Sequence, residues 1–155
     1  MKVIRQLVHV TARFCISLVF LAGAANKILH WHDTERFLVN VLSEWQSYVG
    51  FSEQLQAGLS FLIPWAPVLV VLAILCELLG GLSVLLGIRE KWGAGLLILF
   101  LIPTTALIHQ FWFIEGSARD MQIAHFLKNL AIIGGLFMIL LQENELPKIA
   151  FPPKF

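Results

Sequence analysis

Four long apolar stretches alternate with shorter polar stretches along the chain. They cover about residues 7–29, 64–88, 92–113 and 121–141, and each holds roughly 20 residues or more. A helix of this length crosses a hydrocarbon core about 30 Å thick. The pattern therefore predicts an all-α protein built as a bundle of four transmembrane helices.

The polar connections differ in length and character. The first, His30–Ile63, is long and mixes aromatic with charged residues, a composition typical of short helices in the membrane interface. We expect one or two such helices there. Arg89–Lys91 predicts a tight turn and Ile114–Asp120 a short polar connection. The basic tail Pro147–Phe155 contains prolines and is expected to be poorly ordered.

Composition supports the membrane assignment and excludes other classes. The 155 residues are 58% hydrophobic and only 14% charged, whereas a soluble domain carries about 25% charge. The length suggests a single membrane domain, residues 1–155. Because the net charge is only +1, there is no basic field to attract nucleic acid.

Basic residues gather in the connections on one side of the predicted membrane. Cytoplasmic loops carry an excess of Lys and Arg, so both termini are expected in the cytoplasm. The first apolar stretch continues to Leu29 and is interrupted by Arg13, which favours a retained helix over a cleaved signal peptide. The residues on the basic side are Lys2, Arg5, Arg89, Lys91, Lys148 and Lys154.

Polar residues inside the apolar stretches indicate the interior of the bundle. An ammonium deep in hydrocarbon, such as that of Lys128, costs about 2.5–3.5 kcal/mol on insertion scales. Glu77 lies near the middle of the second stretch, so we expect it to pair with Lys128 or with Arg13. Most polar groups fall in the half away from the termini, which predicts an outward-facing pocket lined by Asn26, Lys27, Glu77, His109, His125, Lys128 and Asn129.

Each of these residues also has a purely structural interpretation. The same polar groups can form a network that only holds the helices together. Lys27 near a helix end can be an anchor that reaches the interface, and Trp112 can belong to the interfacial belt of aromatics. Arg13 is interpreted as a structural charge near the inner surface. In the functional interpretation, Trp112 joins the substrate-binding residues.

Cysteine and histidine spacing gives no metal site. Cys15 and Cys76 lie in apolar runs without a CxxC pattern and are expected to be small buried side chains; whether they approach each other stays open. His109 and His125 can approach across the third connection, and two histidines in a bundle can ligate haem, but no ligand pattern supports this. No phosphate loop, nucleophile elbow or zinc signature occurs.

Three blocks of the chain resemble the DoxX family of small bacterial membrane proteins. The first is Phe20–Lys27, where the usual Gly-x-x-Lys pattern is one residue longer. The second is Glu77–Gly87. The third runs from Pro103–Trp112 to Phe126–Gly135. Together these blocks touch all four predicted helices.

The resemblance implies a four-helix membrane bundle in the bacterial cytoplasmic (inner) membrane. Family members are linked to subunits of quinone-dependent oxidoreductases and to membrane complexes that handle thiol or oxidative stress. We therefore expect a quinone-linked redox protein, or a subunit of a membrane oxidoreductase complex. In it Glu77, His109 and Lys128 would be catalytic, with Asn26, Lys27, Trp112, His125 and Asn129 binding substrate. No cofactor is evident besides a possible quinone. A non-catalytic assembly subunit and a small-solute carrier are the alternatives.

Overall fold

The computed structural model describes residues 2–142, and helices make up 89% of this part of the chain, which contains no strand. The predicted tail Pro147–Phe155 lies outside the described residues. Two short 3₁₀ turns, η1 and η2, occur at Ile63–Trp65 and Phe111–Phe113. The α-helices are α1 (Lys2–Leu29), α2 (Trp31–Tyr48), α3 (Glu53–Leu62), α4 (Ala66–Leu86), α5 (Glu90–Ile108) and α6 (Ser117–Leu140).

Four segments are long and apolar enough to cross a membrane, which confirms the predicted fold class. The second begins at Glu53 rather than at Pro64, because α3 continues through η1 into α4. Pro64 lies in η1 and Pro67 in the first turn of α4. A helix start does not need the missing N–H of proline, so the prolines do not end the helical path.

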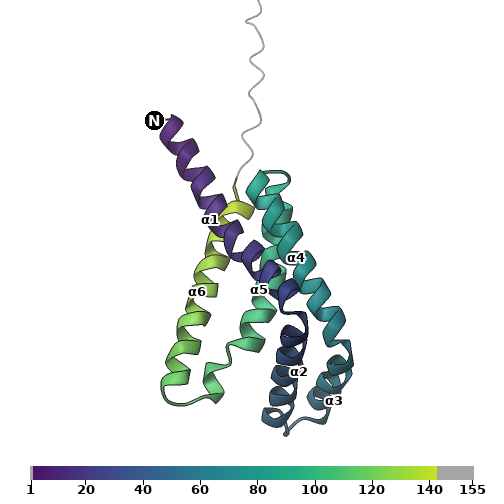
Figure 1. The fold of residues 1–155 in the computed structure, drawn as a ribbon. Coiled ribbons are helices and arrows are strands. Elements are labelled where there is room, and N and C mark those ends of the chain that lie inside the picture. Colours follow the sequence, from purple (N-terminus) through teal and green to yellow (C-terminus); the bar gives the residue numbers. More distant parts are fainter. Residues whose placement is uncertain (1, 143–155) are drawn as a thin grey trace, which may run out of the picture.

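The helices form a bundle with two distinct ends. Figure 1 shows the N-terminus and the turn between α4 and α5 at one end, with α2, α3 and the connection between α5 and α6 at the other. Neighbouring helices pack in the order α1, α4, α5, α6, while α2 packs against α3 and α4. One or two short helices were expected in the long first connection. The structure has α2 and α3 there, and α3 continues into the second candidate span.

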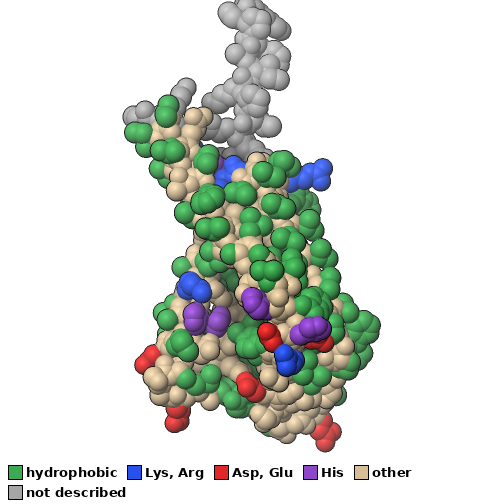
Figure 2. Space-filling view, viewed as in Figure 1, with side chains coloured by type: hydrophobic (Ala, Val, Ile, Leu, Met, Phe, Trp, Pro, Cys, Tyr) green, Lys and Arg blue, Asp and Glu red, His purple; other side chains and the backbone are tan. Residues whose placement is uncertain are grey.

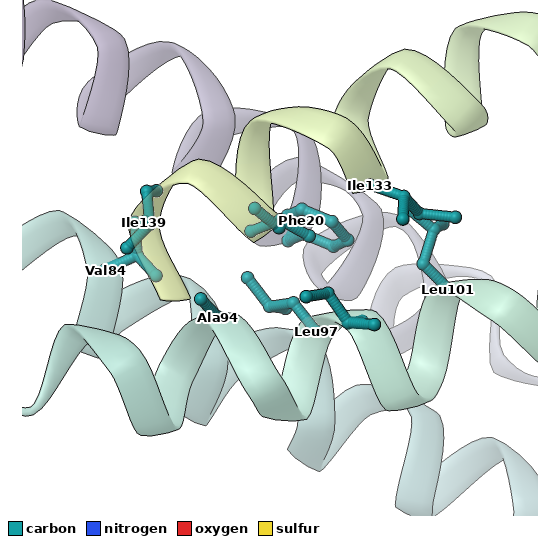
Figure 3. Close-up of a cluster of buried hydrophobic side chains, with 9 residues drawn as sticks. Phe20, Val84, Ala94, Leu97, Leu101, Ile133 and Ile139 are labelled. Atoms are coloured by element: carbon teal, nitrogen blue, oxygen red, sulfur yellow. The ribbon is translucent and has the colours of Figure 1, made fainter. Parts of the chain in front are cut away.

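The main core lies where the four long helices meet. Phe20 from α1 packs with Leu97 of α5 and Leu136 of α6, and all three are at most 2% exposed (Figure 3). α4 and α5 approach closely at small residues. A Cβ added to Gly80 would lie 2.6 Å from Leu97 Cγ, so only glycine fits there. This packing leaves the ends of the bundle free to hold polar groups.

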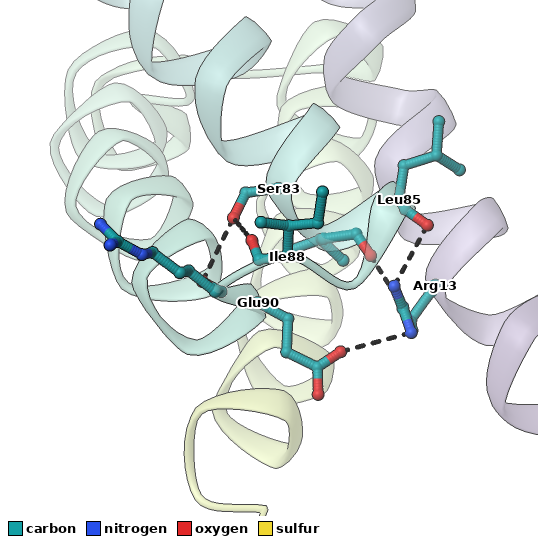
Figure 4. A network of polar contacts seen from close by, with 7 residues as sticks. Arg13, Ser83, Leu85, Ile88 and Glu90 are labelled. Atoms are coloured by element: carbon teal, nitrogen blue, oxygen red, sulfur yellow. Dashed lines mark hydrogen bonds and ion pairs between the residues drawn. The ribbon is translucent and has the colours of Figure 1, made fainter.

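Arg13 closes the C-terminal end of α4. Its guanidinium donates to the carbonyls of Val84 (2.7 Å) and Leu85 (3.2 Å) and lies 3.5 Å from the Glu90 carboxylate (Figure 4). The last carbonyls of a helix have no partner within it, and a cation there also suits the helix dipole. These contacts are compatible with the structural role expected for Arg13, and the alternative pairing of Arg13 with Glu77 was wrong.

The surface agrees with a membrane location. Large apolar side chains are exposed along the outer faces of the long helices, for example Leu79 (60%) and Leu99 (69%). Figure 2 shows hydrophobic side chains over the middle of the visible face and acidic ones only in its lower half. Because lipid, not water, suits such a surface, the chain is a membrane protein with four candidate spans.

Candidate functional site

A buried ion pair joins α1 to α4. The Lys27 ammonium lies 2.8 Å from Oε1 and 2.9 Å from Oε2 of Glu77, and the Glu77 residue is only 4% exposed. The Lys27 side chain keeps 24% of its surface exposed. A carboxylate buried among apolar helices needs such a partner to remain charged. The partner of Glu77 is thus Lys27, and the predicted pairing with Lys128 was wrong.

Gly23 makes the close contact of α1 with Glu77 possible. A Cβ at this position would lie 2.9 Å from Glu77 Oε1, closer than real side chains allow. Lys27 follows four residues later, so it lies one turn further on the same face of α1, and its ammonium is 3.4 Å from the Gly23 carbonyl. The longer spacing between Gly23 and Lys27 therefore still brings both residues to the carboxylate.

A cavity of about 680 Å³ lies beside this ion pair, between α1, α2, α4 and α5. Most of its lining is apolar, including Phe37, Leu72 and Phe100. Its volume falls within the range of small-molecule sites, which are concave, mainly apolar and marked by a few polar groups. The polar residues on its wall are Asn26, Lys27, His30, Asp33, Thr34 and Thr104.

A second polar group lies between the end of α5 and α6, apart from the cavity. The rings of His109 and His125 stack with centroids 5.4 Å apart. His109 Nδ1 is 2.7 Å from Gln122 Oε1, and the Lys128 ammonium is 3.4 Å from His125 Nδ1. His109 and His125 thus meet across the third connection as the sequence predicted. Lys128 itself is exposed on the outer face of α6.

Asn129 points inward although its neighbour Lys128 points outward, because successive residues of a helix turn by about 100°. The Asn129 amide donates to Thr105 Oγ1 at 3.0 Å, and both residues are buried. Thr105 Oγ1 in turn donates to the Leu101 carbonyl at 2.6 Å. This chain of hydrogen bonds ties α6 to α5, as polar side chains commonly do between membrane helices.

Trp112 belongs to an aromatic cluster at the same end of the bundle. Its ring lies 6.2 Å from the Trp45 ring and 6.4 Å from the Phe126 ring. The Trp45 indole N–H donates to the Leu107 carbonyl at 2.9 Å. These contacts connect α2, η2 and α6, and Trp112 does not line the cavity.

The seven predicted lining residues thus divide among different places. Asn26 and Lys27 line the cavity, and Glu77 reaches its edge through Lys27. The other four, His109, His125, Lys128 and Asn129, do not line it. The expectation of one shared pocket was wrong because the sequence gives depth in the membrane but not the direction in which each side chain points.

Several further polar or thiol residues were not predicted as site residues. Cys15 is exposed on α1, so the expectation that it is buried was wrong, whereas Cys76 is partly buried and lines the cavity; both thiols are free. Gln122 was not singled out, although it lies at the start of the fourth predicted stretch, 121–141. Gln110 is 4% exposed and donates to the Glu44 carboxylate at 2.8 Å.

Among residues 2–142, no group of three or more His, Cys, Asp or Glu is placed to hold a metal ion.

Comparison with known proteins identifies the family. No curated protein and no solved structure matches the chain. The family model described as DoxX matches residues 8–110, which is more than half of the chain. This range contains both partners of the Lys27–Glu77 ion pair and every residue that lines the cavity. The chain belongs to the DoxX family.

Proposed function

We propose that this protein binds a quinone-type molecule in the cavity beside Lys27 and Glu77. It would act as a subunit of a membrane oxidoreductase complex in the bacterial cytoplasmic membrane, with both termini in the cytoplasm. The observation that carries the proposal is a mainly apolar cavity with an ammonium on its wall. A quinone combines a long apolar tail with a headgroup whose carbonyl oxygens accept hydrogen bonds.

The ion pair favours a neutral ligand over an anion. Glu77 neutralises the Lys27 charge, so the site offers N–H donors without a net positive charge. The contact of the ammonium with the Gly23 carbonyl is long, at 3.4 Å, and a ligand carbonyl at hydrogen-bond distance would replace it. Thr104 and Asn26 are further polar groups on the cavity wall. A quinone therefore fits this site better than a charged sulfur compound.

The proposal concerns binding rather than turnover. The expected catalytic set of Glu77, His109 and Lys128 does not assemble, since Lys128 lies against His125 and is not bonded to Glu77. His109 is bonded to Gln122. Proton relay through these three residues is thus not part of the proposal. Electrons would pass between the bound quinone and a partner subunit that carries the redox chemistry.

The test is titration of the purified protein in nanodiscs with a short-chain, fully ring-substituted quinone. Full substitution leaves no ring position for addition of the Cys76 thiol. We expect saturable binding in the wild type. Ala73→Phe, which fills the cavity, and the charge-free double variant Lys27→Met/Glu77→Gln should each weaken it at least tenfold. Lys128→Met, outside the cavity, is the matched control and should bind as the wild type does.

Two outcomes would overturn the proposal. One is the absence of saturable binding in the wild type. The other is equal affinity in the wild type and in Ala73→Phe, because the quinone would then partition into lipid without using the cavity. Protection of Cys76 from a thiol reagent by the quinone gives a second readout at the cavity wall. This protection assay uses the wild-type protein, so it does not depend on the folding of the ion-pair variants.

A second candidate function, assembly with another membrane subunit, is favoured by the position of Lys128. This residue lies eleven positions after the start of α6, about 16 Å along the helix, and is exposed. Charged residues within membrane-spanning helices usually face a partner. A neighbouring subunit with a carboxylate in its membrane helix would supply the partner for the Lys128 ammonium. Lys128→Leu should then release a co-purifying subunit from the native complex, while quinone binding stays unchanged.

A further inference from the structure

A second groove lies on the outer side of α4 and α5, at the end of the bundle near the N-terminus. Its volume is about 930 Å³. Leucines form its floor along both helices, and three polar or aromatic residues, Arg89, Lys91 and Trp92, lie at the turn between them. The quinone proposal does not use this groove, and the two cavities share no lining residue.

At the turn between α4 and α5, the two basic side chains line the groove and the acidic side chain does not. Arg89, Glu90 and Lys91 are consecutive, but only the two basic residues line the groove. The Glu90 carboxylate turns to the other side, where it lies 3.5 Å from the Arg13 guanidinium (Figure 4). Within residues 2–142, no Asp or Glu lines the groove. Its polar end is therefore positively charged, while its floor is apolar.

The backbone of this turn is firmly held. The Ser83 hydroxyl donates to the Ile88 carbonyl at 2.6 Å and also lies 3.2 Å from the Arg89 carbonyl. Gly87 adopts a left-handed conformation that ends α4, and Arg89 also has a positive φ of 52°. Such a conformation is uncommon for a residue other than glycine. These contacts hold the backbone from which the Arg89 and Lys91 side chains extend beside the groove.

We infer that this groove is a binding site for an anionic phospholipid. The phosphate would contact Arg89 and Lys91, an acyl chain would lie on the leucine floor, and Trp92, which is 80% exposed, would lie at the headgroup level. The arrangement suits an amphiphile whose charge lies at one end. A free phosphate would leave the apolar floor uncovered, so lipid accounts for both parts of the groove.

The experiment is native mass spectrometry of the full chain, released from micelles with equal amounts of phosphatidylglycerol and phosphatidylcholine. We expect selective retention of the anionic lipid. Arg89→Gln and Lys91→Gln should each weaken this retention about fivefold, the equivalent of about 1 kcal/mol per cation at a membrane surface. The matched control is Arg5→Gln, which removes one positive charge from α1 near the same end and should have little effect.

A steric pair of variants tests the apolar floor. Gly95→Leu places a side chain in the groove and should reduce lipid retention, whereas Gly134→Leu, in open space on α6, should not. Equal retention of the two lipids, or the same loss in Arg5→Gln as in Arg89→Gln, would overturn the site in favour of a diffuse basic surface. Displacement of the lipid by millimolar inorganic phosphate would also contradict it.

Discussion

The ammonium of Lys27 contacts both carboxylate oxygens of Glu77, at 2.8 and 2.9 Å, across fifty residues of sequence. The two partners are unequally buried, with 24% of the Lys27 side chain exposed and 5% of the Glu77 side chain. Loss of one partner should therefore have very different consequences from loss of the other. The pair also connects α1 to α4 at the wall of the cavity.

Lys27→Met should destabilise the protein by about 3–5 kcal/mol, because it leaves the buried Glu77 carboxylate without a counter-charge. Glu77→Gln should cost less, since Lys27 remains partly exposed. The double variant should recover much of the stability lost in Lys27→Met. Denaturant unfolding in mixed micelles measures all three. A double variant no more stable than Lys27→Met would show that the two residues do not act as a pair.

Gly23→Ala should weaken the same pair without removing either charge. The new methyl group would lie 2.9 Å from Glu77 Oε1 and would displace the carboxylate, at a cost of about 1–3 kcal/mol. Gly134→Ala is the matched control, because a Cβ there meets no atom within 4 Å. Thermal unfolding of the two variants compares them directly. Equal melting temperatures would contradict the close approach of α1 to Glu77.

Lys128→Leu and Asn129→Leu should differ in their effect on the stability of the isolated protein, although the two residues are neighbours. Asn129 is 8% exposed and bonded to Thr105, so its loss removes a hydrogen bond between helices and introduces a different shape, costing about 1 kcal/mol. Lys128 is exposed, so leucine there should leave stability unchanged or raise it. Unfolding in micelles distinguishes them, and a large loss in Lys128→Leu would place that ammonium in the interior.

Gly87→Ala should be costly because of both its backbone and its neighbour. Its φ is 69°, and an added Cβ would overlap the Arg13 guanidinium. The left-handed conformation alone costs about 1–2 kcal/mol for alanine. In an Arg13→Leu background the overlap is removed, so the cost of Gly87→Ala should fall toward that value. A double-mutant cycle on unfolding free energies measures this coupling, and additive effects would exclude it.

The number and class of the helices could be predicted from the sequence by length and hydropathy. An apolar run of about 20 residues has few alternatives to a membrane-spanning helix, because every backbone polar group must find a partner in lipid. The boundaries of α1, α5 and α6 lie within five residues of those predicted. The second helix differs most, since Pro64 and Pro67 begin new turns without breaking the helical path from Glu53 to Leu86.

The candidate site was predicted less well. Asn26, Lys27 and Glu77 could be singled out because polar residues are costly in lipid, and they do lie at or beside the cavity. The sequence could not tell that Glu77 meets Lys27 rather than Lys128. That choice depends on the rotation of α1 and α6 about their axes and on the absence of a side chain at Gly23.

By itself, the sequence determined that this is an all-α membrane protein with charged groups in its spans, because both properties follow from the transfer of residues between water and lipid. Only the tertiary structure decided which charges meet. Residues 128 and 129 are neighbours in the chain, yet one faces outward and the other binds Thr105. Pairing requires atoms of different helices within about 3 Å. Only packed helices set such distances.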